Sequence, residues 1–126
     1  MKGKISILLV EDNQMAQMLL KLKLEQVGCG VTTANDGTSG LKLAAENSYD
    51  LIFMDIGLPD MSGIDATKTI RKSSGPNAKI PIIALTAYSE EDFKDQALAE
   101  GMDDFLVKPL NEVAAQAIIK KYVKIN

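Results

Sequence analysis

The sequence predicts an α/β fold, a single (βα)5 domain with a doubly wound parallel sheet of five strands. Five short apolar runs rich in β-branched residues each fit a buried strand, and a segment with helical spacing follows each of them. The runs are apolar throughout, which is typical of a parallel sheet covered by helices on both faces. A length of 126 residues is about one domain, so we expect residues 1–126 to form one unit.

The predicted strands are Ile5–Val10, Val31–Ala34, Leu51–Met54, Pro81–Leu85 and Asp103–Val107. The first of them, Ile5–Val10, is too short for a membrane span or a signal-peptide core with its cleavage site. We therefore expect a cytoplasmic protein with no membrane contact from this domain.

The helices are predicted from apolar residues three and four positions apart. The faces expected to be buried are Met15, Met18, Leu19 and Leu22; Leu41 with Ala44 or Ala45; Ile64 with Thr67 or Lys68 and Ile70 or Arg71; Phe93, Ala97 and Leu98; and Val113, Ala114, Ala117 and Ile118. Ser62, Ser89 and Asn111 are candidate N-caps, and Gly28 ends the first helix. We interpret residues 73–79 as a surface loop.

Composition excludes several kinds of chemistry. With 46% hydrophobic and 25% charged residues the chain can bury a core. Fourteen Lys and Arg against seventeen Asp and Glu give a net charge of −3, which argues against direct nucleic-acid binding. The chain has no histidine, so it supplies no Ser-His-Asp triad, His-ligated zinc or phosphohistidine. The single Cys29 rules out an internal disulfide and fits a reducing compartment.

Reactive side chains follow four of the five predicted strands. Glu11 and Asp12 come after the first strand, Asp55 after the third, Thr86 after the fourth and Lys108 after the fifth. Ligands of open parallel sheets bind outside the carboxyl ends of the strands. We therefore expect these side chains to meet at one edge, whereas residues 35–37 after the second strand resemble an ordinary turn.

Three carboxylates at one edge repel each other. At about 4 Å and an effective dielectric constant near 20, each pair costs roughly 4 kcal/mol. One lysine does not offset this, and a divalent hard cation with open positions for water or phosphate oxygens suits Mg²⁺. Acids, Mg²⁺, a hydroxyl and an ammonium are the groups that phosphoryl transfer requires, with a carboxylate as nucleophile.

Taken singly, most of these residues have an ordinary structural explanation. Asp12 could cap the helix that begins near Asn13, and Thr86 or Lys108 alone would be unremarkable. Asp55 is harder to explain, because a carboxylate at the end of a core strand is costly unless it is paired or bound to a metal. All four strand ends together favour a functional site.

Four motifs resemble those of the receiver domain of two-component response regulators. They are Leu9-Val-Glu-Asp-Asn13, Met54-Asp-Ile-Gly-Leu-Pro-Asp-Met-Ser-Gly63, Ala84-Leu-Thr-Ala87 and Phe105-Leu-Val-Lys-Pro109. Their order and spacing match over essentially the whole chain, with a texture most similar to receivers of hybrid sensor kinases or single-domain regulators. The resemblance implies the flavodoxin-like strand order 2-1-3-4-5.

The resemblance also implies a role for each residue. Asp55 would be the phosphoacceptor. Glu11, Asp12, Asp55 and the backbone carbonyl of Gly57 would bind Mg²⁺. Thr86 would donate its hydroxyl to the phosphoryl group, Lys108 would pair with that group, and the peptide from this lysine to the following proline is usually cis. Phe105 would be the switch aromatic that turns inward with Thr86 and remodels the face made by the fourth helix, fifth strand and fifth helix.

The implied partners lie outside the chain. The phosphodonor would be a histidine kinase or histidine phosphotransfer domain, and the output protein or domain is unknown. The family also allows a phosphorylation-dependent dimer. The chain ends about one helix after Lys108, so we expect either a protein that works by docking or one domain of a longer protein. It would be no enzyme beyond its own phosphoryl transfer and acyl-phosphate hydrolysis.

Three alternatives belong to other classes. A phosphorylation-independent pseudo-receiver, acting as a protein-interaction module, would be expected to lack one or more of these site residues. A haloacid dehalogenase-type phosphatase usually carries a second Asp two positions after the nucleophile, where this chain has Gly57. A flavodoxin would need a phosphate-binding loop after the first strand, and Glu11 and Asp12 would repel a phosphate there unless a metal intervened.

Overall fold

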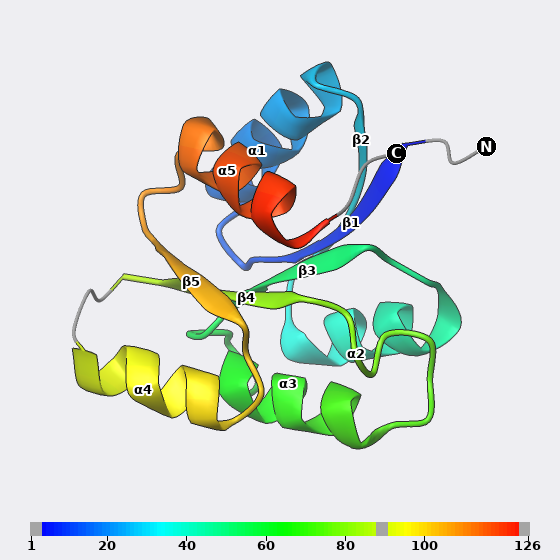
Figure 1. Ribbon diagram of the computed structural model, residues 1–126, viewed down its shortest axis with the longest axis vertical. Coiled ribbons are helices and arrows are strands. Elements are labelled where there is room, and N and C mark those ends of the chain that lie inside the picture. The colour runs from blue at the N-terminus through cyan, green and yellow to red at the C-terminus, as the bar shows by residue number, and fades with distance from the viewer. Residues whose placement is uncertain (1–3, 88–90, 124–126) are drawn as a thin grey trace.

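The structure is a computed structural model that describes residues 4–87 and 91–123 (Figure 1). Strands and helices alternate in the order β1 (Ile5–Val10), α1 (Gln14–Gln26), β2 (Cys29–Ala34), α2 (Gly37–Glu46), β3 (Leu51–Asp55), α3 (Gly63–Lys72), β4 (Ile82–Thr86), α4 (Glu91–Ala99), β5 (Asp104–Val107) and α5 (Glu112–Tyr122). In this described part of the chain, no helix has the length and apolar character needed to cross a bilayer.

The five strands form one parallel sheet in the order β2-β1-β3-β4-β5. Figure 1 shows α1 and α5 on one face of the sheet and α2, α3 and α4 on the other. The predicted (βα)5 fold and strand order are confirmed. The five predicted strands are all present, with ends that differ by at most two residues.

The sheet separates two apolar cores, because successive side chains of a strand point to opposite faces. Phe53 of β3 belongs to the core under α1 and α5, whereas Met54 belongs to the core under α2, α3 and α4. Both are fully buried. This two-sided burial explains why the strand sequences are apolar throughout.

The helix ends largely follow the predicted signals. Ser62 caps α3 by accepting a hydrogen bond from the amide of Ile64, and Asn111 caps α5 through the amides of Val113 and Ala114. Gly28, at φ 97°, follows the end of α1 in the left-handed region that favours glycine. Ser89 and the side chain of Phe93 lie outside the described residues.

The predicted buried face of α1 is wrong. Leu20 and Leu24 face the sheet and are 3% and 0% exposed. The four residues expected to be buried are instead 50% to 71% exposed: Met15, Met18, Leu19 and Leu22. The helix is apolar on two sides, so spacing alone cannot decide which side the sheet covers.

The predicted face of α5 is wrong except at Ile118, which is partly buried against the core under α1 and α5. Ala115 and Ile119 are buried against the sheet, and Val113 is 72% exposed. On the other side of the sheet, Ala44, Ile70 and Ala97 are buried as predicted.

Residues 73–79 are not simply a surface loop, because Asn77 is buried. Its side-chain amide donates to the carbonyl oxygens of Ala44 and Asn47, and its Oδ1 accepts from the amide of Tyr49. This side chain ties the segment before β4 to the end of α2 and the start of β3.

Candidate functional site: an acidic strand edge

The predicted site residues meet at the carboxyl edge of the sheet. Asp55 is the last residue of β3 and Thr86 the last of β4. Glu11 and Asp12 directly follow β1, and Lys108 directly follows β5. Their convergence follows from the parallel register, in which Val10 pairs with Met54, Asp55 with Leu85 and Thr86 with Val107.

Lys108 bridges two buried carboxylates. Its Nζ lies 2.8 Å from Asp55 Oδ2 and 3.0 Å from Glu11 Oε1. The Glu11 side chain is fully buried and that of Asp55 is 4% exposed, whereas that of Lys108 is 27% exposed. The ammonium therefore reaches inward from the mouth of the site and partly compensates two negative charges.

Backbone amides hold the two carboxylates in place. The Gly57 amide donates to Asp55 Oδ1 at 2.9 Å, and the Asn13 amide donates to Glu11 Oε2 at 2.9 Å. Each acid thus has one oxygen fixed by the main chain and the other turned toward Lys108.

The two acids respond to this environment in opposite directions. Burial raises the pKa of Glu11 to about 7, and the neighbouring Asp55 adds to this effect. Burial by itself would raise the pKa of Asp55, but hydrogen bonds involving Lys108, Glu11 and the Gly57 amide outweigh it and lower that pKa. Asp55 is therefore the acid that stays ionised at neutral pH, as a nucleophile must.

A divalent cation fits the acidic cluster. Carboxylate oxygens of Glu11, Asp12 and Asp55 lie within 4.8 Å of one another. Glu11 Oε1 is buried and, although Lys108 is close, makes no hydrogen bond of acceptable geometry. Asp12 is exposed and does not cap α1, because Asn13 does so through the amide of Ala16. An orphaned oxygen and an open third carboxylate form the oxygen-rich, partly open ligand set that Mg²⁺ prefers.

A cavity of about 400 Å³ opens in front of Asp55. It is lined by Asp12, Asp55, Ile56, Gly57, Thr86, Ala87 and Lys108. Thr86 is 5% exposed and forms part of the cavity wall. The peptide between Lys108 and Pro109 is cis, as expected. Phe105 is partly buried against the core under α2, α3 and α4.

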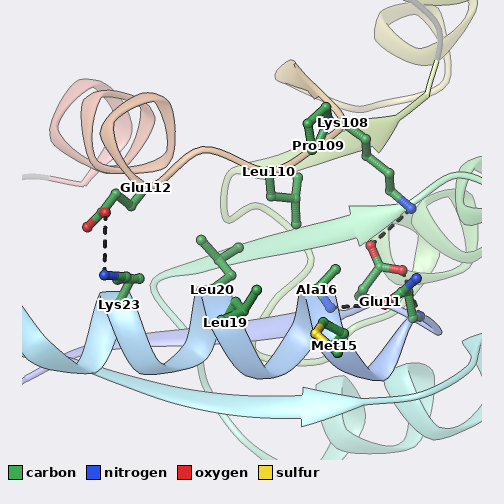
Figure 2. A pocket seen from close by; sticks show the side chains of 11 residues that line it. Glu11, Met15, Ala16, Leu19, Leu20, Lys23, Lys108, Pro109, Leu110 and Glu112 are labelled. Atoms are coloured by element: carbon green, nitrogen blue, oxygen red, sulfur yellow. Dashed lines mark hydrogen bonds and ion pairs between the residues drawn. The ribbon is translucent and has the colours of Figure 1, made fainter.

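A second hollow, a groove of about 650 Å³, lies beside the acidic edge between α1 and the segment that joins β5 to α5. Figure 2 shows Met15, Leu19 and Lys23 of α1 on one side and Pro109, Leu110 and Glu112 on the other. Glu11 and Lys108 line this groove, and Lys108 also lines the cavity in front of Asp55. The apolar side of α1 that the sheet leaves exposed therefore continues into the acidic site.

Sequence reasoning missed the role of Gln17, and it expected Gly63 to keep the loop after Asp55 compact without showing how close that glycine comes to Asp55. The Gln17 side-chain amide donates to Glu11 O and Ala34 O, and to Asn35 Oδ1. This side chain connects the β1–α1 loop to the end of β2. No pattern in the sequence predicts this contact. A Cβ on Gly63 would lie 2.0 Å from the carbonyl oxygen of Asp55. The glycine in the motif after Asp55 could have signalled this close approach.

Comparison with known proteins identifies the family. The model of the response regulator receiver domain matches residues 7–120. The chain belongs to the response regulator receiver domain family. Receiver domains are signalling modules of two-component and phosphorelay systems, so the resemblance inferred from the four motifs is confirmed.

Three receiver-containing proteins illustrate the match. Hybrid signal transduction histidine kinase G of Dictyostelium discoideum is 40% identical over 121 residues, which are 94% of this chain and 4% of the kinase. The receiver domain of the sensor histidine kinase PA1611 of Pseudomonas aeruginosa, with a magnesium ion coordinated in its active site cleft, is 36% identical with a TM-score of 0.85; the match covers 96% of this chain and 98% of that one.

The third is a co-crystal structure of the Saccharomyces cerevisiae histidine phosphotransfer protein Ypd1 with the receiver domain of the response regulator Ssk1. The receiver domain in that structure is 33% identical to this chain with a TM-score of 0.87, and the match covers 98% of this chain and 91% of the other. Among curated relatives, the chain spans 4% of kinase G and 17% of the Vibrio cholerae sensor kinase CqsS. It therefore corresponds to one module of these proteins.

Proposed function

We propose that residues 1–126 form one phosphoacceptor receiver domain, in which Asp55 takes a phosphoryl group from a phosphohistidine. The observation that carries this proposal is the position of Asp55. Its ionised carboxylate is buried at the sheet edge, is held by Lys108 and the Gly57 amide, and faces an open cavity. The single buried Cys29 supports a cytoplasmic location.

The chemical step needs little from the protein beyond placement and charge. An oxygen of Asp55 forms a bond to phosphorus as the phosphorus–nitrogen bond of the donor breaks, and the donor imidazole keeps the electron pair of that bond. Lys108, already 2.8 Å from Asp55 Oδ2, stays close to the phosphoryl oxygens that arrive there. The product is an acyl phosphate. The chain would catalyse only this transfer and the hydrolysis of the acyl phosphate.

Glu11, Asp12, Asp55 and the Gly57 carbonyl would hold Mg²⁺. When bound, the ion supplies positive charge for the phosphoryl oxygens and for the carboxylates around them. The magnesium ion in the PA1611 receiver domain supports this assignment.

Thr86 and Phe105 would couple phosphorylation of Asp55 to a rearrangement of the surface. Thr86 lies on the wall of the cavity, where its hydroxyl would donate to a phosphoryl oxygen. Phe105 sits on β5, next to β4, in register with Ala84. Movement of Thr86 toward the phosphate would make room for the ring to turn inward and would remodel the surface of α4, β5 and α5. That surface would bind the output partner or a second copy of the domain.

The donor must come from outside these 126 residues, because they contain no histidine. The exposed side of α1 offers it a docking surface: Met15 and Leu19 line the groove in Figure 2, and Met18 and Leu22 extend the same apolar face. An apolar helical surface on a histidine phosphotransfer domain or histidine kinase would fit there. The complex of Ypd1 with the Ssk1 receiver domain shows that such a partnership exists among similar chains.

Labelling with acetyl phosphate and Mg²⁺, followed by intact mass spectrometry, tests the proposal. We expect the parent protein to gain one phosphoryl group and Asp55→Asn to gain none. Asp50→Asn is the matched control, because Asp50 accepts the Ser6 amide just before β3 and thus lies at the opposite edge. Equal labelling of Asp55→Asn and the parent would refute the assignment. Absence of labelling, together with no amide shifts near Thr86 and Phe105 on adding beryllofluoride and Mg²⁺, would favour a pseudo-receiver.

A further inference from the structure

Asp60 joins the loop after Asp55 to a neighbouring helix. It lies in the β3–α3 loop, yet its carboxylate accepts three hydrogen bonds from the start of α2. Oδ1 accepts the Gly37 amide at 2.8 Å, and Oδ2 accepts the Thr38 amide at 2.9 Å and the Thr38 hydroxyl at 2.6 Å. These bonds lower the pKa of Asp60 to about 2, so the carboxylate is ionised in ordinary buffers.

This contact is additional to the normal cap of α2. Asp36 is the N-cap residue and accepts the amide of Ser39 at 2.7 Å. The first turn of α2 is therefore served by two aspartates, one from its own segment and one from a distant loop. Of these two aspartates, only Asp60 links α2 to the loop after Asp55.

The base of the β3–α3 loop is fixed by backbone contacts. The Gly63 amide donates to Ile56 O at 2.9 Å, Gly57 and Ser62 form an antiparallel bridge, and a Cβ on Gly63 would collide with Asp55 O. At the tip, Met61 packs so closely on Gly37 that a Cβ there would lie 2.3 Å from Met61 Cγ. Asp60 and Met61 thus hold the tip of the loop against α2.

Gly57 depends on these backbone anchors. It has no side chain, is exposed, and a Cβ added to it would meet only Asp55 Oδ1, at 3.9 Å. No packing of its own holds it in place. Its amide nevertheless has to point at Asp55 Oδ1, and under the proposed function its carbonyl has to point at the cation.

We propose that Asp60 is a positioning residue of the acceptor site, which fixes Gly57 by tying the loop tip to α2 and so sets the affinity for Mg²⁺. The inference rests on the proposed function only for the identity of the cation. Mg²⁺ demands near-ideal octahedral geometry, and loss of residues that orient its ligands typically costs 10- to 100-fold in affinity. Because two residues, Leu58 and Pro59, separate Asp60 from Gly57, we expect a loss near the lower limit.

Calorimetric titration of Mg²⁺ into Asp60→Ala and Asp36→Ala tests this. Both variants remove a carboxylate that accepts hydrogen bonds from the start of α2, three in the case of Asp60 and one in the case of Asp36, so both should lower the melting temperature. Only Asp60→Ala should weaken Mg²⁺ binding, by about 10-fold, and only it should speed hydrogen exchange of the Gly57 amide in metal-free protein. Binding of Mg²⁺ to Asp60→Ala within twofold of the parent, or an equal loss in Asp36→Ala, would overturn the proposal.

Thr38 provides a milder version of the same test. Thr38→Val removes one donor to Asp60, whereas Thr38→Ser keeps the hydroxyl. Thr38→Val should weaken Mg²⁺ binding and speed hydrogen exchange of the Gly57 amide, both to a smaller extent than Asp60→Ala. Thr38→Ser should keep both quantities at the values of the parent protein. Failure of Asp55 to accept phosphate would leave these two readouts intact, so the two proposals fail separately.

Discussion

Replacing Lys108 by methionine should expose the electrostatic tension at the acidic edge. The substitution keeps most of the aliphatic stem but leaves Glu11 and Asp55 facing each other without the ammonium that lies 3.0 and 2.8 Å away. Removing one partner of a buried pair costs about 3–5 kcal/mol. Because Lys108 is partly exposed and Glu11 can take up a proton, we expect a loss of about 3 kcal/mol near pH 8.

The loss should depend on pH in a defined direction. Near pH 5.5, Glu11 is protonated in both proteins, because its pKa is already about 7 with the lysine present. Only the contact with Asp55 is then lost, worth about 1.5 kcal/mol. Urea denaturation followed by circular dichroism in EDTA measures both values, and suits a chain without tryptophan.

Lys121→Met is the matched control, because Lys121 is 64% exposed in its pair with Asp104 at 3.3 Å. It should destabilise the protein much less than Lys108→Met, and to the same small extent at both pH values, because exposed ion pairs contribute little. A Lys108→Met loss that does not change with pH, or that is no larger than the control, would refute the electrostatic reasoning.

Three further predictions concern stability. The pKa of Glu11 rises from 4.5 in the unfolded chain to about 7 in the folded protein. The free energy of unfolding of the metal-free protein should therefore fall by about 3 kcal/mol through this group as the pH rises from about 4.5 to 7. Glu11→Gln should flatten this dependence of stability on pH, and an unchanged dependence would contradict the raised pKa of Glu11. In thermal melts, Gly63→Ala should lose about 1–3 kcal/mol of stability and Gly57→Ala less than about 0.5 kcal/mol. The reason is that only the Cβ added at position 63 would collide with backbone atoms. Equal losses in the two variants would contradict the loop geometry. Leu20→Ala should lower the free energy of unfolding by about 3 kcal/mol and Leu19→Ala by about 0.5 kcal/mol. Only Leu19→Ala should weaken binding of the phosphodonor while the protein stays folded. A larger loss of stability in Leu19→Ala than in Leu20→Ala would mean that the sheet covers the face of α1 that we describe as exposed.

Much of the fold could be predicted because strands buried on both faces leave few alternatives. The run Leu51–Met54 is apolar at every position, and the structure buries all of it. Helix orientation was less predictable. Leu19 and Leu22 lie on one side of α1 and Leu20 and Leu24 on the other, and the wider apolar side is the one left exposed.

The acidic edge could be predicted because parallel topology brings the ends of separate strands together. Asp55, Thr86 and Lys108 needed only their positions after apolar runs. Gln17 and Asp60 could not be predicted, because each reaches a separate element whose approach depends on the finished fold. Gln17 on α1 reaches the end of β2, and Asp60 in the β3–α3 loop reaches the first turn of α2.

The location of the transferred phosphoryl group tests the central claim most directly. After labelling with acetyl phosphate and Mg²⁺, borohydride reduces an acyl phosphate on aspartate to homoserine, and peptide mass spectrometry locates that change. We predict homoserine at position 55 and nowhere else. Reduction at Asp12 or Asp60, with Asp55 unchanged, would contradict the assignment of the acceptor.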